Sequence, residues 1–141
     1  MPLNMELEGK AYEEVTFEVA AEHIERFAGA IGDDDPRYRQ GDASIAPPTF
    51  PTVIQIMTSG QVVVDPELGL NYALVVHGEQ EYEWRRPLRA GDVLRAVPRI
   101  ASIRTRGSNE FLTIEAEIHD QGGEVVVVAR STLISRGTAG G

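Results

Sequence analysis

Hydrophobic residues recur at helical spacing in two stretches of the chain. Between residues 20 and 31, Ile24, Phe27 and Ile31 share one helical face, and charged side chains occupy the other. Between residues 52 and 64 nearly every position is apolar, with Pro51 suited to the first turn and Asp65-Pro66 to a stop. We predict an amphipathic helix first and a largely buried helix second. The apolar stripe of the second helix comprises Val53, Ile56, Met57, Gly60 and Val64.

Elsewhere apolar and polar residues alternate, which indicates half-buried strands. A short strand is predicted before the first helix, and Pro98 indicates an edge or a bulge in a later one. Glycine-containing turns at 106–109 and 120–123 indicate hairpins. The predicted strands are 15–19, 80–85, 93–103, 112–119 and 125–134, of which the last is apolar and not alternating. The last four are expected to form an antiparallel meander.

This order of elements predicts an α+β fold. A long apolar helix followed by a curved antiparallel sheet indicates that the sheet wraps the helix, the arrangement known as a hotdog fold. The length of 141 residues suits one domain, which we place at 1–136, with a disordered tail over 137–141. A single sheet leaves an exposed edge, so we expect the domain to pair with a second hotdog chain.

Composition narrows the chemistry. The absence of cysteine excludes a disulfide scaffold, a cysteine nucleophile and cysteine-ligated metal sites. No apolar run is long enough to span a membrane, so we expect a cytoplasmic protein without membrane contact. The formal net charge of -9 argues against nucleic-acid binding. Within this acidic chain, residues 85–106 carry seven arginines and a single acidic residue, Asp92.

Four segments, in order, resemble the MaoC-like dehydratases and R-specific enoyl-thioester hydratases, a hotdog family. The first runs from Phe27 to Tyr38, where that family ends a helix in the pattern G-D-x-N-P-x-H. The other three are similar to the N-terminal half of double-hotdog members and to the accessory subunit of heterodimeric ones. They are Ala46-Pro47-Pro48-Thr49-Phe50-Pro51, the segment 77–84, and Arg86-Pro87-Leu88-Arg89-Ala90-Gly91-Asp92.

The resemblance implies a catalytic loop that has lost one partner. Hydration of a 2-enoyl thioester needs a group that positions and deprotonates water, a proton donor and donors for the carbonyl oxyanion. The family supplies an aspartate and a histidine, and these positions correspond to Asp33 and Tyr38. An unperturbed tyrosine titrates near pH 10, so Tyr38 suits base chemistry poorly at neutral pH. The alternatives are a solvated turn at Asp33 and a packed aromatic at Tyr38.

Oxyanion donors also look reduced in number. In catalytic members the start of the central helix presents backbone N–H groups to the thioester carbonyl. Here Pro47, Pro48 and Pro51 have no N–H, which leaves the amides of Thr52 and Val53.

Three further groups of residues are candidates for binding, each with a structural alternative. One prediction is that the acyl groove is lined by Thr49, Phe50 and Val53. The alternative is that this loop is only a rigid connector. His77 and Gly78 contact substrate, unless the histidine is a structural residue at a strand start. Arg85 and Arg86 bind phosphate, unless the arginines pair with glutamates on neighbouring strands.

The sequence therefore predicts a substrate-binding, non-catalytic subunit of a MaoC-like enoyl-CoA hydratase or 3-hydroxyacyl-thioester dehydratase. The ligand would be an acyl-CoA or acyl-carrier-protein thioester, and the partner a catalytic MaoC-like chain in a heterodimer or a second copy in a homodimer. We expect no cofactor and no metal, since the histidines lack partners at ligand spacing. The alternatives are a self-sufficient homodimeric hydratase or thioesterase and an acyl-thioester binding module without turnover.

Overall fold

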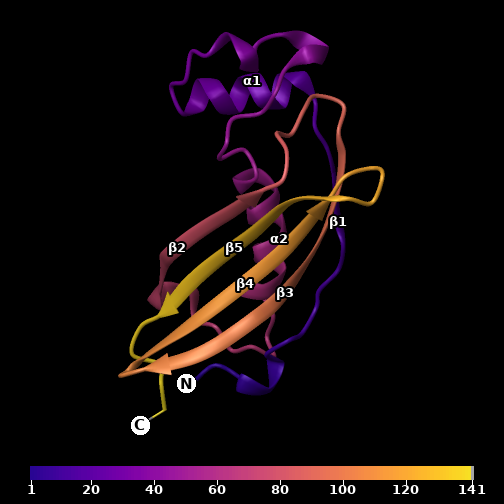
Figure 1. The fold of residues 1–141 in the computed structure, drawn as a ribbon. Coiled ribbons are helices and arrows are strands. Elements are labelled where there is room, and N and C mark those ends of the chain that lie inside the picture. Colours follow the sequence, from indigo (N-terminus) through magenta and orange to yellow (C-terminus); the bar gives the residue numbers. More distant parts are fainter. Residues whose placement is uncertain (141) are drawn as a thin grey trace.

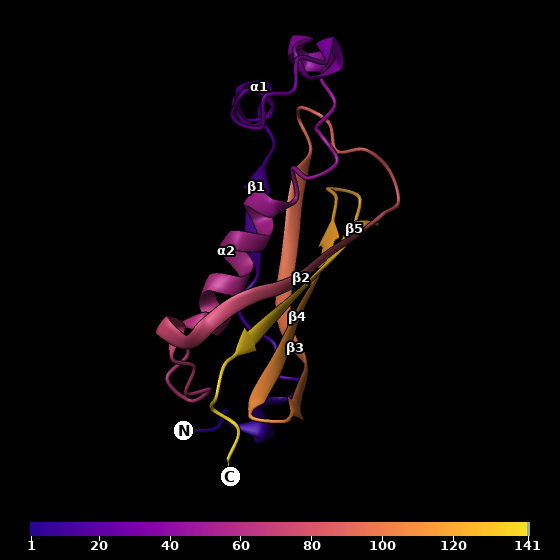
Figure 2. The ribbon, with the colours of Figure 1, turned by 90° about the vertical axis from the view of Figure 1, so that its left-hand side faces the viewer.

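The computed structural model describes residues 1–140, which form one five-stranded antiparallel sheet and two α-helices (Figure 1). The second helix runs along one face of the sheet, and the first helix stands beyond the sheet's end (Figure 2). This arrangement confirms the predicted α+β hotdog fold. In chain order the elements are β1 (Val15–Glu18), α1 (Ala21–Ala30), α2 (Thr52–Val63), β2 (Val75–Trp84), β3 (Val93–Arg106), β4 (Asn109–His119) and β5 (Val125–Ser135).

The strand order in the sheet is β1-β3-β4-β5-β2. Strands β3, β4 and β5 form the predicted meander, but β2 pairs with β5 and not with β3, so a four-strand meander was wrong. The loop from residue 85 to 92 carries the chain across the sheet instead of turning back tightly. Within residues 1–140 the outer edge of β2 has no strand partner.

Pro98 lies in β3 just beyond the end of its pairing with β1, where residues 9–12 become the neighbouring segment. β1 pairs with β3 only as far as Ala96, and the Pro98 carbonyl then accepts from the Tyr12 N–H at 2.8 Å. The missing N–H of Pro98 points to this same outer side, so the ladder to β4 is unbroken. A bulge follows between Ile100 and Ser102. Of the two alternatives predicted from Pro98, the structure shows a bulge close by, and the edge is wrong because residues 9–12 bond to this side of β3.

Helix α2 is buried on one side only. Ile54, Thr58 and Val62 face the sheet and are buried, whereas Ile56 is 64% exposed and Met57 43%. The predicted stripe is therefore the outward side of the helix, because the sheet covers the other apolar side. A sequence pattern that is apolar almost all round does not reveal which side the sheet takes. No helix within residues 1–140 is long and apolar enough to cross a membrane.

The chain termini lie together at the end of the sheet farthest from α1 (Figure 1). Residues 137–140 do not form the predicted disordered tail, because the Ala139 N–H donates to the Ser108 carbonyl and Thr138 is buried. Gly141 lies outside the described residues. Residues 138 and 139 therefore pack beside the turn that joins β3 and β4, a contact that hydropathy did not indicate.

Candidate functional site

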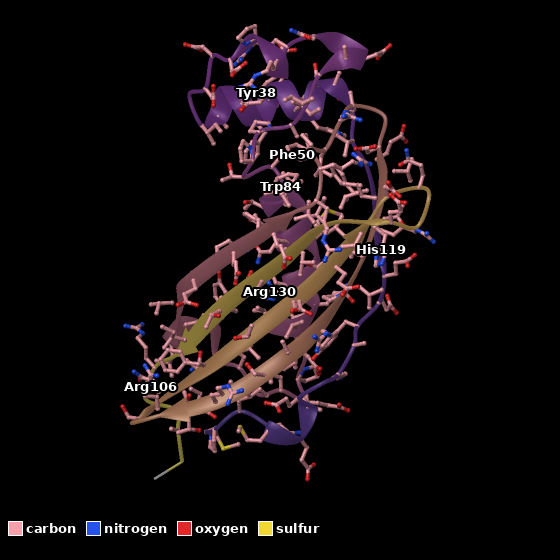
Figure 3. All side chains as sticks on the ribbon, viewed as in Figure 1. Tyr38, Phe50, Trp84, Arg106, His119 and Arg130 are labelled. Carbon is pink, nitrogen blue, oxygen red and sulfur yellow. The ribbon has the colours of Figure 1, made fainter. Side chains whose placement is uncertain are left out.

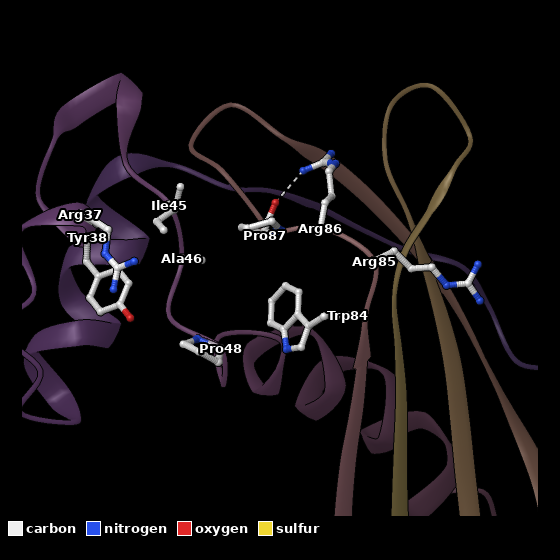
Figure 4. A pocket seen from close by; sticks show the side chains of 9 residues that line it. All are labelled: Arg37, Tyr38, Ile45, Ala46, Pro48, Trp84, Arg85, Arg86 and Pro87. Carbon is white, nitrogen blue, oxygen red and sulfur yellow. Dashed lines mark hydrogen bonds between the residues drawn. The ribbon is translucent and has the colours of Figure 1, made fainter.

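An open cavity of about 340 Å³ lies between the loop that follows α1 and the end of β2. We call it the Trp84 cavity, because the indole of Trp84 lines it from the end of β2 (Figure 4). Figure 3 places Tyr38, Phe50 and Trp84 at the same end of the molecule, far from Arg106. The lining residues are Arg37, Tyr38, Ile45, Ala46, Pro48, Trp84, Arg85, Arg86 and Pro87.

Backbone hydrogen bonds hold two walls of this cavity together. The Ala46 N–H donates to the Leu88 carbonyl (2.7 Å), and the Ala90 N–H donates to the Ser44 carbonyl (3.1 Å). These bonds flank an isolated antiparallel bridge between Ile45 and Arg89. The proline-rich segment and the loop after β2 are thus fixed to each other, so the cavity is preformed.

Two hydrogen-bonding groups face the Trp84 cavity without a partner. Tyr38 is only 6% exposed, and neither its hydroxyl nor the Trp84 Nε1–H bonds to any residue between 1 and 140. No fully buried side-chain oxygen or nitrogen in this part of the chain lacks a partner, so both groups keep contact with open space. In Figure 4 the Tyr38 phenol and the Trp84 indole both project into the cavity.

The acidic loop before Tyr38 stabilises its own turn. Asp33 accepts the Asp35 N–H (3.0 Å) and does not line the Trp84 cavity. Asp35 accepts the Arg37 N–H and pairs with the Arg37 guanidinium (2.6 Å), which lowers the pKa of this carboxyl to about 2. The structure therefore does not present Asp33 and Tyr38 as a pair in one cavity.

The two backbone amides at the start of α2 that could serve an oxyanion, those of Thr52 and Val53, already form hydrogen bonds within the chain. The Thr52 N–H donates to the Thr49 carbonyl (3.0 Å), and the Val53 N–H donates to the Phe50 carbonyl (3.0 Å). The Thr52 hydroxyl also contacts the Tyr82 hydroxyl (2.5 Å), and burial raises the pKa of that tyrosine. This helix start accordingly lacks the free donors that stabilise a tetrahedral or enolate oxygen.

The three residues predicted to line the acyl groove, Thr49, Phe50 and Val53, have different surroundings in the structure. Thr49 is exposed, whereas Phe50 is fully buried and packs edge-on against Phe27 at 5.5 Å between ring centroids. Val53 lines a second hollow of about 310 Å³ with Phe17, His23, Arg26, Phe27 and Phe50. Only the Phe50 and Val53 positions therefore border an apolar hollow.

His77 and Gly78 lie at the opposite end of β2. His77 is exposed, and its Nε2 is 2.9 Å from the Glu79 carbonyl oxygen. Gly78 occupies a bulge in the pairing of β2 with β5, where a Cβ would approach the Ile134 Cδ1 to 2.8 Å. The glycine is thus explained by packing, and neither residue meets Tyr38 or Thr49 within this chain.

The two predicted phosphate ligands differ in their surroundings. The Arg86 guanidinium pairs with Asp92 (2.9 Å) and Asp120 (3.2 Å), so it is engaged in a structural network. Arg85 is exposed, and its side chain points away from the Trp84 cavity (Figure 4). Farther along the sheet Arg99 pairs with Glu115 on the neighbouring strand, as the structural alternative predicts, and Arg130 pairs with the same carboxylate.

Sequence reasoning missed Trp84 and Ile45 as lining residues. Trp84 alternates with Tyr82 and Gln80 on the inward side of a predicted strand, and this was the signal available. Its meeting with Tyr38 depends on the tertiary path of the proline-rich loop, for which no local pattern exists.

A family model for the FAS1-like, dehydratase domain region matches residues 6–129. The chain is 43% identical to the UPF0336 protein of Saccharopolyspora erythraea over 148 aligned positions, which cover 99% of this chain and 95% of that protein. It is 41% identical to the UPF0336 protein of Streptomyces coelicolor, with 96% and 97% covered.

Solved structures of similar fold include two heteromeric complexes. A chain of the HadBC (3R-hydroxyacyl-ACP dehydratase) complex from Mycobacterium tuberculosis aligns with a TM-score of 0.77 and 25% identity, over 91% of this chain and 96% of that one. A chain of the ChsH1–ChsH2 complex from the same organism aligns with a TM-score of 0.68 and 18% identity, over 93% and 91%. A MaoC-like dehydratase aligns at 0.82 and 22%, over 92% of this chain and 42% of that one.

Proposed function

Because this chain belongs to the family of FAS1-like dehydratase domain regions, we propose that it is the substrate-binding, non-catalytic subunit of an acyl-thioester hydratase or dehydratase. A partner hotdog chain with an intact aspartate and histidine would carry out the water addition or removal. This chain would complete the binding groove for the acyl thioester. The observation that carries the proposal is the engagement of the amides at the start of α2, together with tyrosine in the family's histidine position.

Each element of the family's chemistry has another use or is absent here. The Thr52 and Val53 amides donate within their own turn, so an oxyanion would find no free pair of donors. The Asp33 carboxylate accepts a backbone amide outside the Trp84 cavity. A tyrosine at position 38 is mismatched to general base catalysis at neutral pH.

The exposed edge beside α2 supports a partner chain. One edge of β2 is unpaired in the described chain, and such an edge is a template for strand addition. A groove of about 350 Å³ runs between α2 and β2, where Ile56 and Tyr72 are 64% and 72% exposed. We call this the edge groove; its other lining residues are Gln55, Ser59, Gly60, Val63, Val75, His77 and Leu133. An apolar patch next to an open strand edge is typical of a protein interface.

The similar folds within the HadBC and ChsH1–ChsH2 complexes support association with another chain of the same fold. Antiparallel addition of a partner strand to β2 would bring the partner's groups toward both ends of that strand. His77 and the edge groove would then border the partner, which would give His77 surroundings that the single chain lacks.

Activity assays on the purified chain, alone and with a co-expressed hotdog chain that has the intact aspartate and histidine, test the proposal. Hydration of short and bulky 2-enoyl thioesters is expected only with the partner. Asp33→Ala in this chain should leave the turnover number of the complex within about twofold, and Tyr38→His should create no activity in the isolated chain. Turnover by the isolated chain that disappears in Asp33→Ala would instead establish a self-sufficient homodimeric enzyme.

A separate binding measurement distinguishes the third possibility. Calorimetric titration measures whether the isolated chain binds an acyl-CoA. Binding to the isolated chain, combined with no turnover with any co-expressed partner, would identify a binding module. An increase in turnover of the catalytic chain when this chain is added supports the subunit role.

A further inference from the structure

We infer that the Trp84 cavity binds the uncharged pantetheine arm of an acyl thioester, with the Tyr38 hydroxyl and the Trp84 Nε1–H donating hydrogen bonds to its carbonyl oxygens. This inference rests on the proposed function and names the part of the ligand that the cavity recognises. The arm is shared by coenzyme A and by acyl carrier proteins, and it offers two amide carbonyls and one thioester carbonyl.

The first argument is the pair of unpartnered donors. Tyr38 as a whole is only 6% exposed, and its hydroxyl, which keeps contact with the open cavity, has no protein partner within residues 1–140. Water in the open cavity is the partner left to this hydroxyl, and a ligand that displaces the water must supply an acceptor in its place. The indole N–H of Trp84 is a donor with no acceptor capacity. A ligand with carbonyl oxygens would satisfy both groups at once.

The second argument is the charge around the cavity. The Arg37 guanidinium is paired with Asp35 (2.6 Å), and the Arg86 guanidinium is paired with Asp92 and Asp120. Arg85 lines the cavity, but its side chain points away from it (Figure 4). Within the part of the chain that the structure describes, no unpaired cation is directed into this space. The cavity thus suits neutral carbonyl groups and not phosphates.

The third argument is the shape and the walls. Ile45, Pro48 and Pro87 give apolar sides, and backbone hydrogen bonds between 44–46 and 88–90 hold these sides in place. A volume of about 340 Å³ lies at the small end of ligand sites, which suits a slender chain and not a complete nucleotide thioester. The phosphate-bearing part of the ligand would therefore lie outside the cavity.

Trp84 supplies the experiment, because it is the only tryptophan of the chain. The purified protein, alone and in complex with its catalytic partner, would be titrated with hexanoyl-pantetheine, hexanoyl-CoA and a hexanoyl carrier protein while the Trp84 emission is followed. The matched Trp84→Phe complex provides the blank for partner fluorescence. All three ligands should change the emission, and hexanoyl-pantetheine should bind within about threefold of hexanoyl-CoA because phosphate is not recognised.

Variants separate the two donors from general packing. Tyr38→Phe removes only the hydroxyl and should weaken binding of all three ligands about fivefold, the loss typical of one neutral hydrogen bond. Tyr12→Phe removes a hydroxyl that bonds to Asp65 outside both the Trp84 cavity and the edge groove, and it is the matched control, with unchanged affinity expected. Arg85→Ala should also leave the affinity for hexanoyl-pantetheine unchanged.

Calorimetry run in parallel keeps the two proposals distinguishable. If calorimetry detects thioester binding while Trp84 emission and the Tyr38→Phe affinity stay unchanged, the ligand binds elsewhere and this inference is wrong, although the proposed function stands. A requirement for the CoA phosphates, seen as no response to hexanoyl-pantetheine, also overturns it. If no thioester binds to the chain or to the complex, the proposed function itself fails.

Discussion

The Glu110 carboxylate accepts the Thr138 hydroxyl at 2.7 Å and the Leu3 N–H at 2.9 and 3.1 Å. Glu110 is 1% exposed and stands at the start of β4. One buried side chain thereby ties both ends of the chain to the turn between β3 and β4. The ordering of residues 137–140 has its cause in this contact.

We predict that Glu110→Ala lowers the free energy of unfolding by about 2–3 kcal/mol, because the Leu3 amide and the Thr138 hydroxyl lose their acceptor in a buried place. Urea denaturation followed by circular dichroism measures the change. Glu117→Ala, an exposed glutamate on the same strand, is the control and should cost less than about 0.5 kcal/mol. Equal losses in the two variants would contradict the role given to Glu110.

Adjacent arginines should differ in their effect on stability. Arg86→Ala removes the partner of Asp92, a carboxylate that is 6% exposed, and should cost about 2–3 kcal/mol. Arg85→Ala, at an exposed position without a carboxylate partner in residues 1–140, should change stability by less than about 0.5 kcal/mol. Thermal unfolding of the two variants provides the comparison, and a larger loss for Arg85→Ala would refute the assignment.

Acid should destabilise the fold through Glu115. Burial alone would raise the pKa of this carboxyl, but hydrogen bonds from Arg130 and Arg99 outweigh it and lower the pKa. Because the pKa is lower in the folded state, the ionised group stabilises the fold above its unfolded pKa, and this contribution is lost as pH falls through the folded pKa. The free energy of unfolding should thus decrease between about pH 5 and pH 3.

The variant Arg130→Met tests this cause. Removing one of the two donors should make the loss of stability between about pH 5 and pH 3 shallower, by less than about 1 kcal/mol because the pair is partly solvated. Urea unfolding at each pH measures the slope. The conservative variant Arg130→Lys should keep part of it, and an unchanged slope in Arg130→Met would assign the acid sensitivity to other carboxylates.

Association should depend on the exposed side of α2. Ile56→Lys places a charge beside the edge groove and should weaken binding to the partner chain at least tenfold, as expected for an apolar residue at an interface centre. Light scattering and analytical ultracentrifugation measure the complex. Val97→Lys, at a 41% exposed position on β3 outside this groove, is the matched control. Loss of association in the control alone would place the interface elsewhere.

The candidate site shows where sequence reasoning stopped. Residue types alone predicted a turn at Asp33 to Asp35, and the structure shows the side chains of Asp33 and Asp35 bonded to backbone amides within that turn. They also predicted that Pro47, Pro48 and Pro51 provide no N–H donors before α2. The residues predicted to bind ligand lie apart in this chain: Thr49 is in the loop before α2, His77 is at the far end of β2, and Arg86 is paired with Asp92. Trp84 joined Tyr38 in their place, and 46 positions separate the two residues in the chain.

Periodicity alone determined most of the elements. Helical spacing predicted α1 and α2 within about two residues, and alternation predicted β4 and part of β2, because a regular element repeats its burial every 3.6 or 2 residues. The strand β5 was predicted from its apolar run. Glycine turns at 107 and 123, both with positive φ, determined the hairpins.

Tertiary structure decided what periodicity leaves open. The placement of β2 beside β5, the side of α2 that stays exposed and the burial of Thr138 all depend on contacts between distant segments. Strand pairing and helix facing are choices between arrangements that satisfy the local pattern equally well. They are settled by the hydrophobic area and the hydrogen bonds of the whole domain, and the Trp84 cavity is a consequence of those choices.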